Sequence, residues 1–220
     1  MSRVLILSDT HEPFAHPHAI EFMLDVKARF KCDRVVHSGD EIDQCALSQF
    51  DSDPDGMSAG DELKASVAAM QKWYKAFPKV DVMESNHGMR PFKKAFRAGI
   101  PRAYMKSYRE FMKAPTGWNW HPKMFIDNVL YFHGEPFAGA TGHINAATKT
   151  RSSVVIGHLH CAGGASYMQT HKDRIFALNV GCAINDKTYP FKYAENHATR
   201  PTLGCGVVLD GREAFFIPMK

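Results

Sequence analysis

Short apolar runs recur along this chain, and several of them stop abruptly at a polar cluster. The first run, residues 4–7, is unbroken and rich in branched side chains, and Asp9 and His11 follow it. Such a run is typical of a strand that is buried on both faces of a mostly parallel sheet. Because alternate side chains of extended backbone point the same way, Asp9 and His11 are expected to leave the strand tip together.

The same arrangement returns four times further along the chain. Apolar strands are predicted at residues 35–36, 80–83, 129–132 and 154–156. The polar segments that follow them are H-S-G-D, E-S-N-H, H-G and G-H-L-H. In open α/β sheets, ligand sites collect beyond the carboxyl ends of the strands. The five clusters are therefore expected to meet at one place.

The segments between these strands predict helices and turns. Helical spacing is found at residues 19–30, 61–77 and 140–149, and a basic helical stretch covers residues 90–113 with a break at 99–101. Residues 115–120 predict a loop that leads into a hairpin, residues 123–126 and 129–132 around an Asp-Asn turn. The last strands are predicted at residues 175–180, 207–209 and 214–217.

Composition narrows the class of protein. At 220 residues, 45% hydrophobic and 23% charged, the chain is typical of one globular α/β domain. No apolar run approaches the roughly 20 residues of a membrane span, and the first residues lead straight into a strand without a signal peptide. Five scattered cysteines without a C-x-x-C spacing favour reduced thiols. These features predict a cytoplasmic protein that has no membrane partner.

The polar clusters together have the composition of a metal site. They combine carboxylates, imidazoles and one amide without a cysteine, which suits borderline divalent ions such as Mn²⁺, Fe²⁺ or Zn²⁺. Seven such ligands exceed what one tetrahedral ion can use, so two ions are expected.

The order of these clusters resembles the calcineurin-like metallophosphoesterases. The motifs of that family run D-x-H, G-D-x-x-[DEN], G-N-H-[DE], H and G-H-x-H. In this chain they correspond to D-T-H at 9–11, G-D-E-I-D at 39–43, S-N-H-G at 85–88, His133 and G-H-L-H at 157–160. The resemblance implies an α/β fold of two packed mixed β-sheets flanked by helices. It implies a single domain over residues 1–220, with a basic helical insertion at about 90–113.

The resemblance also implies a role for each matched residue. Asp40 would bridge two ions, and His87 would be a catalytic histidine that binds no ion. The first ion would be held by Asp9, His11 and His160, and the second by Asn86, His133 and His158. Two positions depart from the family pattern. Ser85 replaces the usual glycine, and Gly88 replaces an acidic residue that commonly orients the catalytic imidazole.

The implied activity is hydrolysis of phosphodiesters by a hydroxide that two metal ions activate. Manganese is the first choice of ion, and zinc, iron and nickel are alternatives. His87 would protonate the leaving oxygen. A small-molecule phosphatase or a cyclic-nucleotide phosphodiesterase of the same fold is an alternative, as is a binding module that keeps the ions without catalysis. The native metal and the oligomeric state stay open.

The basic stretch at 90–113 bears on the substrate. It holds eight lysines and arginines against one acid, Glu110, with aromatic residues between them. Phosphate contacts combined with base stacking would make this segment part of a nuclease that acts on DNA or RNA. The alternative is a solvated helix whose aromatic residues pack inward. Changing Lys93, Lys94 and Arg97 to glutamate should abolish nuclease activity, and should affect a small-substrate enzyme little.

Two further patterns carry weaker predictions. Residues 51–62 match the calcium-loop pattern D-x-D-x-D-G-x₅-E, although a turn-rich loop that caps the following helix is the favoured interpretation. Seven histidines match no motif and are expected to be surface or hydrogen-bonded core residues. They are His16, His18, His37, His121, His143, His171 and His197.

Overall fold

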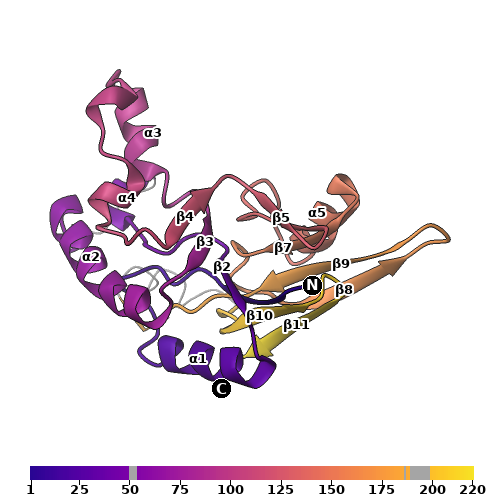
Figure 1. Ribbon diagram of the computed structural model, residues 1–220. Coiled ribbons are helices and arrows are strands. Elements are labelled where there is room, and N and C mark those ends of the chain that lie inside the picture. The colour runs from indigo at the N-terminus through magenta and orange to yellow at the C-terminus, as the bar shows by residue number, and fades with distance from the viewer. Residues whose placement is uncertain (50–53, 186, 189–198) are drawn as a thin grey trace.

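Two mixed β-sheets pack face to face in the computed structural model, which describes residues 1–49, 54–185, 187–188 and 199–220 (Figure 1). The first sheet has the strand order β11-β10-β1-β2-β3-β4. Its strands are β1 (Arg3–Leu7), β2 (Arg34–His37), β3 (Val80–Met83), β4 (Trp118–His121), β10 (Gly204–Leu209) and β11 (Glu213–Pro218). Strands β1 to β4 are parallel to one another, β10 is antiparallel to β1, and β11 is antiparallel to β10.

The second sheet has five strands in the order β5-β6-β7-β9-β8. They are β5 (Met124–Ile126), β6 (Val129–Tyr131), β7 (Ser153–Ile156), β8 (Gly163–Gln169) and β9 (Arg174–Val180). The β5–β6 hairpin turns at Asp127 and Asn128, which both have positive φ, as the Asp-Asn sequence predicts.

Helices cover the outer faces of both sheets (Figure 1). Helices α1 (Ala19–Phe30) and α2 (Ala59–Ala76) lie on the first sheet, and α5 (Gly142–Thr150) lies on the second. The predicted fold class, two packed mixed sheets flanked by helices, is confirmed. Within the described residues, no helix is long and apolar enough to cross a membrane.

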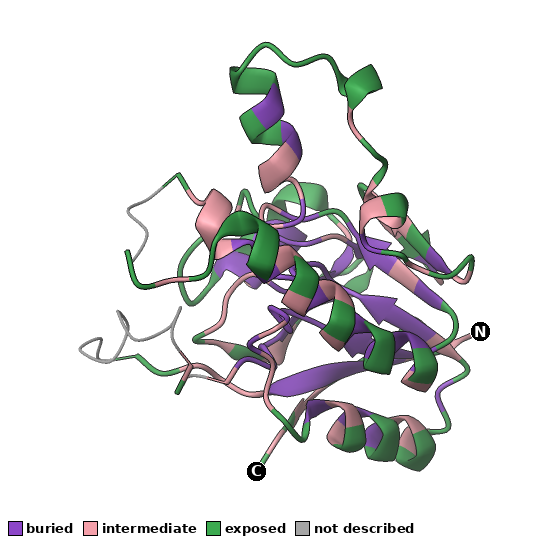
Figure 2. Ribbon diagram, turned by 90° about the vertical axis from the view of Figure 1, so that its left-hand side faces the viewer, coloured by how far each residue is buried: buried purple, intermediate pink, exposed green. Residues whose placement is uncertain are grey.

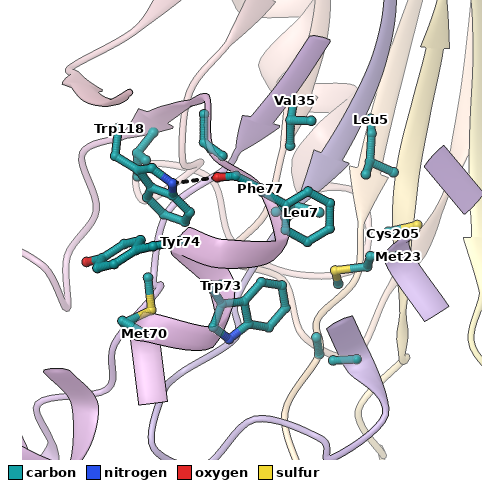
Figure 3. Packing of buried hydrophobic residues seen from close by; sticks show 14 of the residues in the cluster. Leu5, Leu7, Met23, Val35, Met70, Trp73, Tyr74, Phe77, Trp118 and Cys205 are labelled. Atoms are coloured by element: carbon teal, nitrogen blue, oxygen red, sulfur yellow. Dashed lines mark hydrogen bonds between the residues drawn. The ribbon is translucent and has the colours of Figure 1, made fainter. Parts of the chain in front are cut away.

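Alternation along β1 divides its side chains between two cores. Leu5 and Leu7 pack under α1 and α2 in a cluster with Trp73 (Figure 3), whereas Val4 and Ile6 face the second sheet. These four side chains are at most 1% exposed, and burial of a leucine or isoleucine side chain contributes about 1.5–3 kcal/mol. The strand is therefore fixed from both sides, and with it the loop that carries Asp9 and His11.

The loop predicted at residues 115–120 was wrong, because β4 begins inside it. Val80 of β3 pairs with Trp118 in a parallel register, and the Trp118 indole is fully buried and donates to the Phe77 carbonyl at 2.8 Å (Figure 3). A four-residue strand beside a proline and a glycine has too little periodicity to be recognised locally. The pairing with β3 supplies the extended conformation.

The basic stretch at residues 90–113 is helical in three short pieces. They are α3 (Arg90–Arg97), the 3₁₀ turn η2 (Arg102–Tyr104) and α4 (Tyr108–Phe111). The gap between α3 and η2 contains the break predicted at residues 99–101. Ser107 begins α4 with a capping box, in which its hydroxyl accepts from the Glu110 backbone N–H.

Candidate metal centre

Five loops, each following a strand, bring the seven candidate ligands together. The loops follow β1, β2 and β3 of the first sheet and β6 and β7 of the second. The side chains form one group of Asp9, His11, Asp40 and His160, and another of Asp40, His133 and His158. Asp40 is common to both groups, and Asn86 adjoins the second, with its Oδ1 atom 2.7 Å from His133 Nε2.

The first group brings four ring and carboxylate atoms close enough together to bind one ion. Asp9 Oδ1 lies 3.0 Å from His160 Nε2, and the Nε2 atoms of His11 and His160 are 3.2 Å apart. His11 Nε2 is 3.7 Å from Asp40 Oδ2. Asp9, His11 and Asp40 are at most 1% exposed, so this end of the site is closed by protein.

The second group is built in the same way around the other side of Asp40. Asp40 Oδ2 lies 3.2 Å from His133 Nε2, which is also 3.2 Å from His158 Nδ1. In both groups two imidazole nitrogens therefore lie 3.2 Å apart, close enough to share either a proton or a metal ion. The donor set of oxygen and nitrogen atoms fits two borderline divalent ions.

The backbone that presents these ligands differs from the expected extended conformation. Asp9 and His11 both have φ of 47°, Asp40 has 52° and His158 has 66°. A non-glycine residue with positive φ costs about 1–3 kcal/mol and concentrates at functional sites. The two β1-tip side chains converge because the chain coils tightly after Leu7, and not because of strand alternation.

At two positions the ligands pack so closely against the backbone that only glycine fits. Gly39 has φ of 106°, and a Cβ atom there would lie 2.7 Å from His133 Nδ1. A Cβ atom on Gly157 would overlap Ser8 Oγ and Asp9 Oδ2. Any side chain at either position would displace a ligand.

Partners outside the ligand set fix the orientation of the histidine rings. His11 Nδ1 donates to Asp43 Oδ1 at 2.7 Å, and His133 Nδ1 donates to the Ser38 carbonyl at 2.9 Å. In both rings the other nitrogen, Nε2, is left facing the site. The sequence had placed Asp43 in a motif without a role. Its place in the motif could have marked Asp43 as a functional residue, but the sequence could not show that it binds the His11 ring.

The buried carboxylates set the protonation of these rings. Burial alone would lower the pKa of His11, but hydrogen bonds to Asp43 and Asp9 outweigh it and raise this pKa to about 10. Burial likewise opposes the charge on His133, and Asp40 raises its pKa to about 9. Burial disfavours the charged form of Asp40 too, yet the neighbouring His133 and His87 hold its pKa well below the usual range. Without ions, protons therefore balance the carboxylate charge.

Binding of divalent ions is expected to weaken as the pH falls. Ion binding needs neutral imidazoles, so the protons of His11 and His133 must leave. Each displaced proton lowers the apparent affinity about tenfold per pH unit below the pKa, hence about 100-fold between pH 8 and pH 6 for the ion at each group and about 10⁴-fold for the pair of ions. Calorimetric titration with Mn²⁺ in buffers of different ionisation enthalpy measures both the affinity and the protons released. An affinity that is the same at both pH values would contradict this expectation.

The same pKa shifts act on the stability of the metal-free protein. The pKa values of His11 and His133 are higher in the folded protein than the value of 6.5 for the unfolded chain. Their protonation therefore stabilises the fold in full at a pH below 6.5, and this contribution is lost as the pH rises through about 9 to 10.

His87 lies beside the two groups, at the open side of the site. Its Nδ1 atom is 2.6 Å from the Asp43 carbonyl and 3.2 Å from Asp43 Oδ1, and its Nε2 atom is 3.9 Å from Asp40 Oδ2. The Arg90 guanidinium lies 3.0 Å from the same Nε2 atom. Because a guanidinium can only donate, Nε2 accepts here, and the Nδ1 proton is donated to Asp43.

The two departures from the family pattern have structural explanations. The Ser85 hydroxyl accepts from the backbone N–H groups of Asp40 at 2.9 Å and Gly88 at 3.3 Å. A Cβ atom on Gly88 would lie 3.2–3.3 Å from Ser85 Oγ and the Tyr108 ring, so the space of an acidic side chain is already filled. Asp43 and Arg90 hold the His87 ring instead.

A basic hollow of about 200 Å³ opens next to the site. It is bounded by Asn86 and His158 on one side and by α3 on the other. Its cationic lining consists of Arg90, Lys93, Lys94 and Arg97.

The weaker sequence patterns have different outcomes. Residues 51–53 of the acidic loop lie outside the described residues, and the Glu62 carboxylate accepts from the backbone N–H groups of Cys45 and Ala46 at 2.7 and 2.9 Å. Among the unmatched histidines, His37 is buried and lies 3.2 Å from Thr10 Oγ1, as expected of a hydrogen-bonded core residue. His197 lies outside the described residues.

Comparison with known proteins gives similarity only to solved structures. No family model and no curated protein matches the sequence. Vps29 from Entamoeba histolytica, in a structure complexed with Zn²⁺, aligns with 96% of this chain and 88% of its own at 15% identity, with a TM-score of 0.43. YfcE, a phosphoesterase from E. coli, aligns with 93% of this chain and 87% of its own at 14% identity, also with a TM-score of 0.43.

Vps29 from Cryptosporidium parvum aligns with 94% of this chain and 85% of its own, at 13% identity and a TM-score of 0.42. At these identities and TM-scores, the likenesses carry no conclusion about function. The coordinates themselves show two mixed sheets flanked by helices, with the five motifs gathered where their loops meet. The chain is therefore an α/β sandwich, two packed mixed β-sheets flanked by helices.

Proposed function

We propose that this protein is a metal-dependent phosphoesterase that hydrolyses phosphodiesters. The observation that supports it most directly is the position of Asp40, whose carboxylate belongs to both ligand groups. A shared carboxylate suits a pair of ions, with Asp9, His11 and His160 on one and Asn86, His133 and His158 on the other. The chemistry that two divalent ions supply when bound is neutralisation of phosphate charge and activation of water.

His87 is proposed to move the proton to the leaving oxygen. Asp43 holds the Nδ1 side of the ring, so Nε2 is the nitrogen available to a substrate. This nitrogen lies beside Asp40 and at the open side of the site, where a leaving group would be placed. An imidazole suits this transfer near neutral pH: Nε2, which accepts from Arg90 in this structure, takes up a proton from solvent and then gives it to the developing alkoxide.

Arg90 is proposed to bind the phosphate beside His87. Its guanidinium donates to the carbonyls of Asp43 at 2.9 Å and Gln44 at 3.1 Å, which hold the side chain in place. A cation fixed in this way needs little reorganisation when negative charge builds on the phosphate oxygens.

Replacing Arg90 by alanine is expected to lower kcat/KM about 10²–10³-fold, the usual loss for one charge-stabilising donor. The Arg90→Lys variant should recover only part of this loss, because lysine cannot keep the carbonyl and imidazole contacts at once. Steady-state kinetics on a phosphodiester reporter measure both variants. Full activity in Arg90→Lys would show that only the charge matters, and full activity in Arg90→Ala would remove this residue from the site.

Reporter assays with defined metals test the proposed activity. The hollow beside Asn86 and His158 leaves room for the second substituent of a diester. The protein reconstituted with Mn²⁺, Zn²⁺, Fe²⁺ or Ni²⁺ is expected to hydrolyse bis-(p-nitrophenyl) phosphate faster than p-nitrophenyl phosphate, with Mn²⁺ as the preferred ion. Faster hydrolysis of the monoester would favour a small-molecule phosphatase. No hydrolysis of either with any of these ions would refute the proposal.

A further inference from the structure

Residues 90–106 form an arm that projects from the body of the protein (Figure 1). The arm consists of α3, η2 and the turns that join them, and much of its surface is exposed (Figure 2). Phe92 and Ala95 anchor the base of α3, at 9% and 8% exposed, and the Arg102 guanidinium lies 4.6 Å from the Phe92 ring centroid.

Two aromatic rings on this arm are almost entirely exposed. Phe96 is 84% exposed and Tyr104 is 82% exposed, the highest values among the large apolar rings in the described part of the chain. The next, Phe125 on β5, is 60% exposed. Two large rings that stay exposed on one short segment do not contribute the free energy of burial to folding. Such an arrangement indicates a surface that binds a partner molecule.

The charge around these rings has one sign. Residues 90–109 contain no aspartate or glutamate. The only acid that pairs with the arm among the described contacts is Glu135, whose Oε1 atom is 3.1 Å from Lys93 Nζ. The basic residues of the arm are Arg90, Lys93, Lys94, Arg97, Arg102 and Lys106. A surface that combines exposed rings with unbalanced cationic charge is complementary to a polyanion that carries planar groups.

Two hollows connect this surface with the metal centre. The hollow of about 200 Å³ beside Asn86 and His158 shares Lys93 and Arg97 with a second hollow of about 440 Å³. Phe96 lines the second hollow, together with Phe92, Ile100, Arg102 and Met105. Lys93 and Arg97 therefore join the hollow beside the candidate ligands to the hollow that Phe96 lines.

We infer that the arm binds single-stranded nucleic acid and directs it to the metal centre. Lys93, Lys94 and Arg97 contact successive phosphates, while Phe96 and Tyr104 stack on unpaired bases. A duplex would bind less well, because its bases are already stacked and paired. This inference rests on the proposed function in one respect: the strand that the arm holds supplies the phosphodiester that the centre cleaves.

Fluorescence anisotropy with labelled 12-nucleotide probes tests the inference. The probes are mixed-sequence single-stranded DNA, the same sequence as RNA, and the duplex. The full chain is loaded with Mn²⁺ and carries His87→Ala, so that the probe is not cut. Both single strands are expected to bind at least tenfold more tightly than the duplex, and the difference between DNA and RNA identifies the preferred sugar.

The contribution of stacking is measured by ring removal. Phe96→Leu and Tyr104→Leu are each expected to weaken single-strand binding at least about fivefold, from the usual contribution of base–aromatic stacking. Phe125→Leu removes an exposed ring outside the arm and is the matched control, with affinity unchanged. Unchanged affinity in both arm variants would overturn the stacking assignment.

The contribution of charge is measured by the dependence of affinity on salt. The triple change Lys93→Gln, Lys94→Gln and Arg97→Gln is expected to reduce the slope of log affinity against log salt by about 2, since each phosphate contact to a single strand contributes about 0.7. An equal slope in the triple variant and wild type would remove these residues from the path. The matched control neutralises three exposed lysines off the arm, Lys123, Lys149 and Lys172.

The outcomes separate this inference from the proposed function. Hydrolysis of the diester reporter without binding of either single strand overturns the arm inference alone. Single-strand binding that depends on Phe96 and Tyr104, without hydrolysis by any metal-loaded form, overturns the phosphodiesterase alone. Duplex binding as tight as single-strand binding rejects the single-strand preference. A dimer that the arm variants convert to monomer, with no oligonucleotide bound, shows that a second copy of this chain covers the rings and overturns the inference.

Discussion

Replacing His87 by alanine is expected to lower kcat by about 10²–10⁴-fold while the bound metal stays constant. The ring is not among the predicted ligands, although it forms a third group with His11 and Asp43, and its Nε2 atom lies 3.9 Å from Asp40 Oδ2. Removal of the ring therefore removes the proton donor and leaves the donors of both ions in place. The diester reporter measures kcat, and elemental analysis of the purified variant measures the metal.

Two results would change the interpretation of this variant. A kcat equal to that of the wild type would refute the role of His87 in proton transfer. A loss of metal together with activity would instead place the ring among the ligands, or show that it holds the neighbouring Asn86. The matched control is His171→Ala, which removes an exposed histidine far from the motifs and should change neither quantity.

Replacing Asp9 by asparagine is expected to reduce metal affinity by more than about 100-fold and to abolish activity in parallel. Mutation of a residue that only supports a metal ligand already lowers metal affinity or activity about 10–100-fold. Asp9 is fully buried, accepts from the Ser8 hydroxyl and the His158 backbone N–H, and lies 3.0 Å from His160 Nε2. The amide keeps the shape of the side chain and loses the negative charge that the ion needs.

Metal titration and circular dichroism together test this second variant. The far-ultraviolet spectrum should stay close to that of the wild type, because β1 is held by apolar contacts on both faces that the change does not touch. Full metal content in Asp9→Asn would remove this residue from the ligand set. Asp25→Asn, on the exposed side of α1, is the control with the same chemical change.

The two predictions differ in how far the sequence alone could support them. Asp9 was identified from a strand tip and its motif, and the structure brings it to His160, which lies 151 residues away. The position of His87 was also identified from its motif, but the absence of an acid at position 88 left its orientation without an explanation. Asp43 and Arg90 provide that orientation through contacts across 44 and 3 residues.

Some elements could not be predicted because their conformation depends on distant partners. β4 takes its extended form from pairing with β3 and from the burial of Trp118 against the Phe77 carbonyl. β8 contains two glycines and little apolar periodicity, and it is a strand because β9 pairs with it along seven residues. In both cases tertiary pairing outweighs weak local preference.

The sequence by itself determined the local features of this protein. Apolar runs, turn residues and helix ends are properties of a few neighbouring residues, so most strands and helices and the five polar strand ends followed from them. Tertiary structure alone decided which strand pairs with which, that Asp43 and Arg90 hold the His87 ring, and that an arm carries exposed rings beside the site. These features are distances between residues far apart in the chain, and such distances are set by packing and strand pairing.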